Sequence, residues 1–250
     1  MIFQEGFQSA VEEITRKCQN YFSNRLRSIY ITGSVGTNEA ISGASDLDYW
    51  GFISDEVSDK DRLWLAKTEL EIGKKFEIFD GVHISIKSIE FLKKDKFTRF
   101  ILKYNSILYY GYDIVSEIDS LSFELYEPNK EVAKERLVFA RQCLKDALEN
   151  KCPQCLDKIP ENTYLAARKF ARYFVLVEGA YFLMSKNKFE SFKQERVIQQ
   201  LKENSCGFND ILDLALEIIK KPLETKVKHD DFIVKVCPFT EWIFAEIERV

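Results

Sequence analysis

Apolar residues recur at helical spacing near the start of the chain and then give way to short runs. Over residues 6–27 they fall at every third or fourth position, which predicts an amphipathic helix. Two runs with β-branched and aromatic side chains, Arg27–Thr32 and Leu47–Ile53, predict strands. A third strand is predicted at Val82–Ser88, where apolar and polar residues alternate.

Two more stretches of the first half have a helical period. The segment Asp59–Phe79 predicts a helix with Asp59 as its N-cap, and Glu90–Tyr104 predicts another. The apolar and small residues of the first of these share one side: Leu63, Ala66, Leu70 and Gly73. The order helix, strand, strand, helix, strand indicates a small α/β domain.

The second half of the chain is almost wholly helical in pattern. The periodicity predicts helices over 129–150, 161–185, 189–204, 208–220 and 237–249. Pro128-Asn129 is a turn signal before the first of them, so we place the domain boundary within 115–128. We therefore expect an α+β chain, with an N-terminal α/β domain (1–120) that holds a small mixed sheet and a C-terminal all-helical bundle (121–250).

Composition narrows the class of partner. The 250 residues are 46% hydrophobic and 30% charged, which is typical of a globular protein with a sizeable core. The net charge is −4 and no long basic run is present, so a nucleic-acid partner is not expected. No apolar run of 18 residues and no signal-like N-terminus occur, which favours a cytoplasmic protein without a membrane partner. The oligomeric state stays open.

Two carboxylates stand one residue apart where the second predicted strand begins. In a strand, residues i and i+2 point to the same face, so Asp46 and Asp48 should converge on one small volume. Two like charges this close are costly without a cation between them. Mg²⁺ fits, because it prefers carboxylate oxygens together with phosphate oxygens of a substrate. The pair therefore predicts a magnesium site.

The end of the first predicted strand carries a turn suited to phosphate. Gly33 allows close approach of the backbone to a phosphate, and the Ser34 hydroxyl and neighbouring N–H groups can donate to its oxygens. Gly36 and Thr37 extend the same loop. Together with the carboxylate pair, this predicts displacement at a nucleotide phosphate.

The stretch GSVGTNEAISGASDLDYW resembles the nucleotidyltransferase superfamily typified by DNA polymerase β. The resemblance implies a Mg²⁺-dependent transfer of a nucleoside monophosphate from a triphosphate, with release of pyrophosphate. It implies that Gly33 and Ser34 hold the triphosphate and that Asp46 and Asp48 hold the metals. In architecture the chain is similar to the small-molecule, aminoglycoside-type adenylyltransferases, which implies ATP as donor and a hydroxyl of a small-molecule acceptor, such as an aminoglycoside-like antibiotic.

The third acid of that superfamily is replaced here by a histidine. It should lie on the strand Gly81–Lys87, where His83 takes the aligned position. His83 could act as a general base, ligate a metal, or mark a weakened site that only binds nucleotide. The weakened site corresponds to a nucleotide-binding regulatory protein. A nucleotide cyclase is a further alternative, because some cyclases share the motif.

The resemblance continues more faintly into the helical half. Leu165–Lys186 resembles a helix of the aminoglycoside adenylyltransferases that ends in Ser-Lys. There, basic residues reach the triphosphate, which implies this role for Arg172 and Lys186, with Arg168 as a neighbour. Glu178 interrupts an apolar run of that segment, so it either meets a cationic acceptor or is exposed.

One cysteine motif remains outside this interpretation. Cys152-Pro-Gln-Cys155 is a C-x-x-C in a helical context, without a second cysteine pair or a suitably spaced histidine. Zinc sites and thioredoxin-like sites need those contexts. The motif is therefore interpreted as a loop with two incidental thiols.

Overall fold

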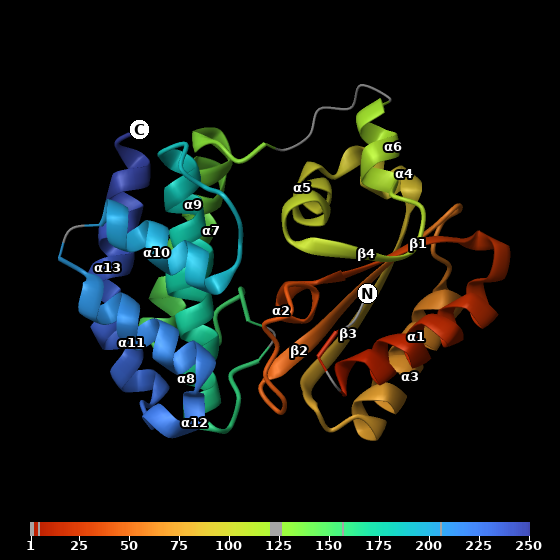
Figure 1. Ribbon diagram of the computed structural model, residues 1–250, viewed down its shortest axis with the longest axis horizontal. Coiled ribbons are helices and arrows are strands. Elements are labelled where there is room, and N and C mark those ends of the chain that lie inside the picture. Colours follow the sequence, from red (N-terminus) through yellow and green to blue (C-terminus); the bar gives the residue numbers. More distant parts are fainter. Residues whose placement is uncertain (1–2, 5, 121–126, 157, 206) are drawn as a thin grey trace. The chain divides into compact units, whose positions relative to one another are not determined.

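The N-terminal half of the chain folds around a mixed β-sheet (Figure 1). The computed structural model describes residues 3–4, 6–120, 127–156, 158–205 and 207–250, and within them the sheet has four strands in the order β3-β2-β1-β4. β1 lies antiparallel to β2 and β4, whereas β2 lies parallel to β3. The strands are β1 (Leu26–Thr32), β2 (Ser45–Ile53), β3 (Phe79–Ser88) and β4 (Ser106–Gly111). The predicted mixed sheet is confirmed, and β4 is an addition to it.

Two helices, α1 (Phe7–Phe22) and α3 (Asp59–Lys75), pack on one face of the sheet (Figure 1). Every second residue of the strands points into this core, as the pleat requires. The sheet contributes Ile29, Ile31, Leu47, Tyr49, Ile84 and Ile86. Burial of these side chains leaves the intervening residues of each strand on the opposite face.

The start of α3 differs from the prediction by one residue. Its N-cap is Ser58, not Asp59: the Ser58 hydroxyl accepts a hydrogen bond from the Asp61 N–H at 3.2 Å. The Asp61 carboxylate in turn accepts from the Ser58 N–H at 2.8 Å, which completes a capping box. Arg25 lies 2.9 Å from the same carboxylate, which is buried. This ion pair ties the first turn of α3 to the chain that enters β1.

The packing side of α3 is not the side that its apolar residues indicate. Leu63 and Leu70 are 74% and 66% exposed, whereas Leu65, Thr68 and Ile72 are buried. The buried Asp61 lies on the same side as Leu65 and Ile72, so its ion pair with Arg25 and these apolar side chains together hold this side of α3 in the core.

The other face of the sheet is partly covered by α4 (Ile89–Lys94), α5 (Lys96–Tyr104) and α6 (Ile114–Ser120) (Figure 1). The single helix predicted over Glu90–Tyr104 is therefore wrong. It breaks at Asp95, whose carboxylate accepts a hydrogen bond from the Thr98 N–H at 2.9 Å and caps α5. The small core on this face holds Tyr30, Phe52, Leu92, Leu102, Ile114 and Val115.

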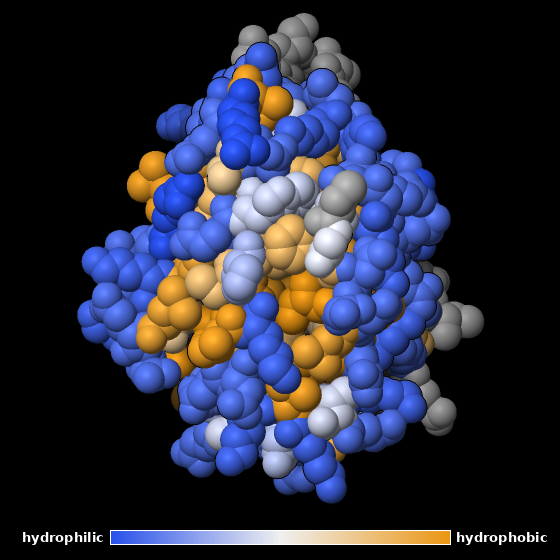
Figure 2. Space-filling model, turned by 90° about the vertical axis from the view of Figure 1, so that its left-hand side faces the viewer, coloured by the Kyte–Doolittle hydropathy of each residue, from blue (hydrophilic) through white to orange (hydrophobic). Residues whose placement is uncertain are grey.

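The chain divides into two compact units, Met1–Tyr126 and Glu127–Val250, and the described part of the second is helical. Apolar surface gathers near the centre of the face shown in Figure 2, bordered by hydrophilic side chains. The helices of this unit are α7 (Lys130–Leu148), α8 (Thr163–Ala171), α9 (Glu178–Ser185), α10 (Gln194–Asn204), α11 (Asn209–Lys220), α12 (Pro222–Thr225) and α13 (His229–Glu248), with a π-helical turn at Arg172–Val177.

Two helix starts in this unit differ from the predictions. The helix predicted from residue 189 begins at Gln194. The helix predicted from residue 237 begins at His229 and continues through Pro238. Proline removes the hydrogen bond to the carbonyl four residues earlier, which belongs to Val234. Val234 is 67% exposed, so the turn of α13 that lacks this hydrogen bond lies at the protein surface.

None of the described helices combines the length and the apolarity needed to cross a membrane.

Candidate functional site

The carboxylates of Asp46 and Asp48 lie on the sheet face opposite α1 and α3. Along β2 they are partly exposed, whereas the residues between and beside them, Ser45, Leu47 and Tyr49, are buried. This alternation places both carboxylates on one face, as the strand period predicts.

The turn after β1 brings Gly33 against Asp48. Gly33 has a φ of +64°, a backbone conformation that favours glycine. A Cβ placed on Gly33 would stand 2.7 Å from the Asp48 Oδ2, closer than real Cβ contacts come. The glycine therefore does two things: it makes the turn, and it leaves room for a carboxylate at the turn. Gly36 is also required, because a Cβ there would collide with the Ile31 carbonyl oxygen.

The short helix α2 (Gly33–Gly36) follows this turn, where the sequence predicts a loop. Ser34 is buried in it. The Thr37 N–H donates to the Gly33 carbonyl at 3.0 Å, and the Glu39 N–H donates to the Ser34 carbonyl at 2.8 Å. The Thr37 hydroxyl donates to the Glu39 carboxylate at 2.8 Å. These bonds fix the backbone next to Asp48.

His83 joins the two carboxylates from the neighbouring strand. It is the register partner of Asp48 in the parallel pair β2–β3, so both side chains project from the same face. The register shifts by one residue beside Gly81. The point where a Cβ on Gly81 would stand lies 3.0 Å from the Asp46 Oδ1 and 3.3 Å from the His83 Nε2. Gly81 thus leaves space beside both the Asp46 carboxylate and the His83 imidazole.

The ammonium group of Lys87 lies farther along the same face of β3. The Lys87 Nζ stands 5.0 Å from the Trp50 ring centre and 4.4 Å from that of Phe91, and donates to the Thr98 hydroxyl at 3.2 Å. Burial lowers the pKa of Lys87, against the opposing effect of Asp95. Lys87 follows His83 at even spacing along the strand, and this spacing is the sequence signal for its place on the same face.

The segment that follows β4 has a structural role in its described contacts. The Tyr30 hydroxyl donates to the Asp113 carboxylate at 2.9 Å and accepts from the Ile114 N–H at 2.9 Å. Burial opposes the ionisation of Asp113, but hydrogen bonds from Ser116 and Tyr30 outweigh it and lower its pKa. These bonds hold the segment against β1.

The basic candidates of the helical unit differ in their surroundings. Arg168 is buried and its Nε donates to the Ile219 carbonyl at 2.9 Å, which ties α8 to the end of α11. Arg172 is half-buried on the π-helical turn. Lys186 is half-buried and forms an ion pair with Glu246 of α13 at 2.9 Å. Arg168 thus has a structural contact, while the roles of the other two stay predictions.

Glu178 is neither exposed nor open to a ligand. Its side chain is 1% exposed, and its Oε1 lies 3.7 Å from the Nε of Arg136 on α7. Burial raises the pKa of Glu178 to about 7, although the positive charge of Arg136 opposes the shift. The expectation that Glu178 meets a cationic acceptor or lies at the surface is therefore wrong. Its partner lies 42 residues away in sequence, which is why no local pattern reveals it.

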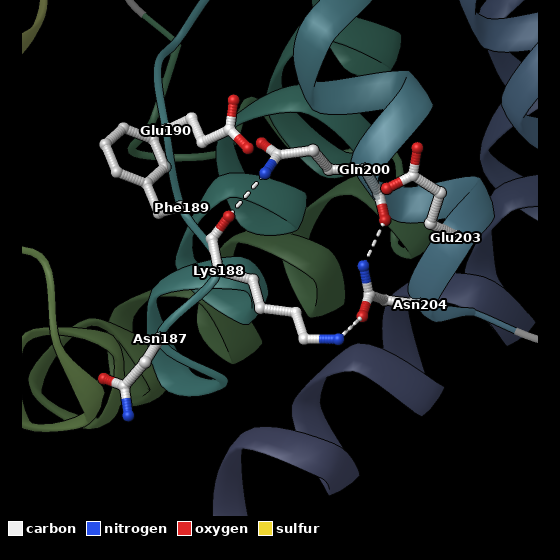
Figure 3. Close-up of a pocket in the computed structure, with 7 residues that line it drawn as sticks. All are labelled: Asn187, Lys188, Phe189, Glu190, Gln200, Glu203 and Asn204. Carbon is white, nitrogen blue, oxygen red and sulfur yellow. Dashed lines mark hydrogen bonds between the residues drawn. The ribbon is translucent and has the colours of Figure 1, made fainter.

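The helical unit holds a polar cavity of about 380 Å³ between the α9–α10 connection and α10 (Figure 3). The Gln200 amide donates to the Lys188 carbonyl at 2.5 Å, and the Lys188 Nζ donates to the Asn204 side chain at 2.5 Å. These bonds fix the wall of the cavity. Its lining consists of Asn187, Lys188, Phe189, Glu190, Gln200, Glu203 and Asn204.

The donors at the sheet fit a magnesium ion bound with a nucleotide. Mg²⁺ is usually held by one or two carboxylates together with water and phosphate oxygens, and Asp46 and Asp48 supply two carboxylates. The space that Gly33 leaves lies directly at the Asp48 oxygen. The His83 nitrogen suits Mg²⁺ less well than an oxygen would. Within the described ranges, no group of three or more His, Cys, Asp or Glu side chains forms a metal site by itself.

Comparison with known proteins rests on structure. By sequence, no protein-family model matches the chain, and no curated protein matches it. The spectinomycin adenyltransferase AAD(9) of Enterococcus faecialis, whose crystal structure contains ATP and spectinomycin, is similar at a TM-score of 0.57 and 12% identity, over 96% of this chain and 99% of that one. A chain of the toxin–antitoxin pair MntA-HepT is similar at a TM-score of 0.33 and 10% identity, over 54% of this chain and 96% of that one. The similarity to the spectinomycin adenyltransferase shows that the chain has the fold of a nucleotidyltransferase. The stretch GSVGTNEAISGASDLDYW predicts this fold.

Proposed function

We propose that the protein transfers the AMP moiety of ATP to a hydroxyl group of a small-molecule acceptor and releases pyrophosphate. The observation that carries the proposal is the convergence of Asp46, Asp48 and His83 beside Gly33 and Gly81. The shared fold with the spectinomycin adenyltransferase supports ATP as the donor and a small-molecule antibiotic as the acceptor class.

The nucleotide would be held at the β1–α2 turn. Gly33 would let the triphosphate approach the backbone. The hydroxyl groups of Ser34 and Thr37, which follow Gly33 in the chain, would donate hydrogen bonds to the phosphate oxygens. Arg172 and Lys186 are the proposed cations for the β- and γ-phosphates. Mg²⁺ bound to Asp46 and Asp48 would neutralise phosphate charge in the transition state.

His83 is proposed as the proton acceptor. The acceptor oxygen attacks the α-phosphorus as the bond to pyrophosphate breaks, and the hydroxyl proton passes to the His83 imidazole. An imidazole suits this role because its ordinary pKa lies near neutral pH. The nearby Asp46 carboxylate, which shares the space over Gly81, would stabilise the imidazolium that forms.

The acceptor would be bound by the helical unit, which we propose as the acceptor-binding domain. The polar cavity at the α9–α10 connection offers oxygen acceptors for hydroxyl and ammonium groups, among them Glu203 and Glu190, whose carboxylate also pairs with Arg196 (Figure 3). The Gln200 Oε1 is buried without a hydrogen-bond partner in the described part of the chain. Such a lining favours a cationic or polyhydroxylated molecule over an apolar one.

The decisive experiment follows both products of the transfer. The purified chain is incubated with ATP, Mg²⁺ and a panel of aminocyclitols and aminoglycosides, while pyrophosphate release and the mass of each acceptor are measured. We expect one acceptor to gain AMP. Asp48→Asn should abolish turnover, while Asp59→Asn, at a fully exposed carboxylate of α3, should retain it. Unchanged turnover in Asp48→Asn would show that this carboxylate is not part of the site.

A second candidate is a nucleotide-binding protein without transferase activity, favoured by the histidine in place of the third acid. ATP binding by calorimetry without adenylylation of any acceptor would support it. Incubation with ATP alone distinguishes a nucleotide cyclase, since a cyclase would form a cyclic product without an acceptor.

A further inference from the structure

The segment that carries Arg172 contains a π-helical turn, Arg172–Val177, between α8 and α9. In such a turn an N–H group bonds to the carbonyl five residues earlier, and here the Glu178 N–H donates to the Tyr173 carbonyl. Residues five apart therefore lie above one another, whereas in an α-helix residues three or four apart do so. The turn thus brings Tyr173 and Glu178 to one side of the segment.

Arg136 of α7 contacts both of these side chains. Its Nη2 donates to the Tyr173 hydroxyl at 2.9 Å, and its Nε lies 3.7 Å from the Glu178 Oε1. Tyr173 and Glu178 are buried, and α7 packs against α9 (Figure 1). The guanidinium carbon also stands 5.4 Å from the ring centre of Tyr181 and 4.6 Å from that of Phe139. One arginine of another helix therefore joins the two ends of the π-helical turn.

The same turn determines which side chains face outward. Over residues 170–185 every residue is buried except Arg172 and Val177, which are half-buried and also five positions apart. In an uninterrupted α-helix these two would differ by about 140° around the axis, because each residue advances about 100°. The π-helical register thus places Arg172 and Val177 on one open side, and Tyr173 and Glu178 on the side that meets Arg136.

Loss of this register would separate a buried charge from its partner. If the turn became α-helical, the segments before and after it would rotate relative to each other by about 100°, the angle of one residue. Either the Tyr173 hydroxyl or the Glu178 carboxylate would then turn away from Arg136. A buried charged group that loses its partner is strongly destabilising. The contacts of Arg136 therefore favour the π-helical register over the α-helical one.

We propose that Arg136 is a positioning residue for ATP binding, because it holds the π-helical turn in the register that presents Arg172 to the triphosphate. The inference rests on the proposed function, in which Arg172 is a cation for the β- and γ-phosphates. Arg136 acts through Arg172, since its own guanidinium is engaged by Tyr173 and Glu178. A planar guanidinium can serve two partners at once, whereas lysine carries a single ammonium group.

Binding of Mg²⁺-ATP to the full-length chain, measured by calorimetry without an acceptor, tests the proposal. Arg172→Gln should weaken binding about 10- to 100-fold, the value of a charged hydrogen bond. Arg136→Lys keeps a positive charge near Glu178 but cannot reach both partners, so it should weaken binding about tenfold. Tyr173→Phe removes only the hydroxyl that Arg136 contacts and should also weaken binding. It decides the test if Arg136→Lys does not fold.

A double variant distinguishes positioning from a general loss of stability. If Arg136 acts through Arg172, Arg136→Lys combined with Arg172→Gln should bind ATP no more weakly than Arg172→Gln alone. Arg141→Lys is the matched control, because Arg141 lies on the same helix but pairs with Glu248 of α13 at 2.8 Å. It should keep the wild-type affinity. In the transfer assay, Arg136→Lys should raise the KM for ATP and leave the KM for the acceptor unchanged.

The outcomes separate this inference from the proposed function. If the unmodified chain does not bind ATP, the proposed function fails and the inference fails with it. If it binds ATP and both Arg136→Lys and Tyr173→Phe bind as tightly as the wild type, the inference alone fails. Additive losses in the double variant, or an equal loss in Arg141→Lys, would overturn it as well, because Arg136 would then act independently of Arg172.

Discussion

Replacement of Gly33 by alanine would have two effects at the β1–α2 turn, one on the backbone conformation and one on the space beside Asp48. The first effect is conformational, because the φ of +64° disfavours any side chain. The second is steric, because the added Cβ would stand 2.7 Å from the Asp48 Oδ2. Only the second involves the candidate site.

The two effects differ in what they change. A residue other than glycine in the left-handed region loses about 1–2 kcal/mol, which corresponds to a melting temperature lower by roughly 2–8 °C. The carboxylate must also retreat from 2.7 Å to an ordinary contact of 3.4 Å or more. A misplacement approaching 1 Å at a reacting site can lower turnover about 100-fold. We therefore expect Gly33→Ala to lose up to about 100-fold in kcat and a few degrees in melting temperature.

Gly43→Ala is the matched control. Gly43 has a φ of +72°, but nothing lies within 4 Å of the position of its Cβ. It should show the same loss of stability and keep its turnover. The assays are thermal unfolding and pyrophosphate release at saturating ATP and Mg²⁺. Equal turnover in the two variants would refute the view that Gly33 makes room for Asp48.

Three further predictions concern stability, measured by urea unfolding. Burial raises the pKa of Glu178 from 4.5 to about 7, so its contribution to the free energy of unfolding is present below pH 4.5 and is lost as the pH rises toward 7. Glu178→Gln should remove this decline of roughly 2–4 kcal/mol. An unchanged dependence of stability on pH in this variant would contradict the prediction. Hydrogen bonds from Arg25 hold the pKa of Asp61 well below its usual range, so its contribution is present above pH 4 and lost as the pH falls further. Asp61→Asn should therefore cost about 2 kcal/mol at pH 7 and less in acid, and an equal cost at pH 3 would speak against the ion pair. Leu65→Ala should lower the free energy of unfolding by about 2–4 kcal/mol, while Leu63→Ala, on the exposed side of α3, should change it by less than about 0.5 kcal/mol. A larger loss in Leu63→Ala than in Leu65→Ala would mean that α3 packs by the side that carries Leu63 and Leu70.

The candidate site was predictable where its geometry is local. Asp46 and Asp48 share a face because residues two apart in any strand do so, and Gly33 ends a strand that its own apolar run marks. The alternating pattern of residues 82–88 predicts the strand that carries His83. The pairing of β2 with β3 places His83 beside Asp48 and on the same face of the sheet. The α+β class likewise follows from the change of period along the chain.

The remaining features depend on contacts between residues far apart in sequence. The side on which α3 packs carries Leu65 and Ile72 and also Asp61, whose partner Arg25 lies far away in sequence. Glu178 is buried because Arg136, on another helix, supplies the opposite charge.

Strand and turn geometry act over a few neighbouring positions, so the local pattern is enough to propose Asp46, Asp48 and Gly33 for the candidate site. Which of the proposed residues have partners depends on how separate elements pack. Charge pairing and the space beside Gly33 and Gly81 arise only when separate elements pack together. Such contacts depend on the register and rotation of whole elements, which no local pattern specifies.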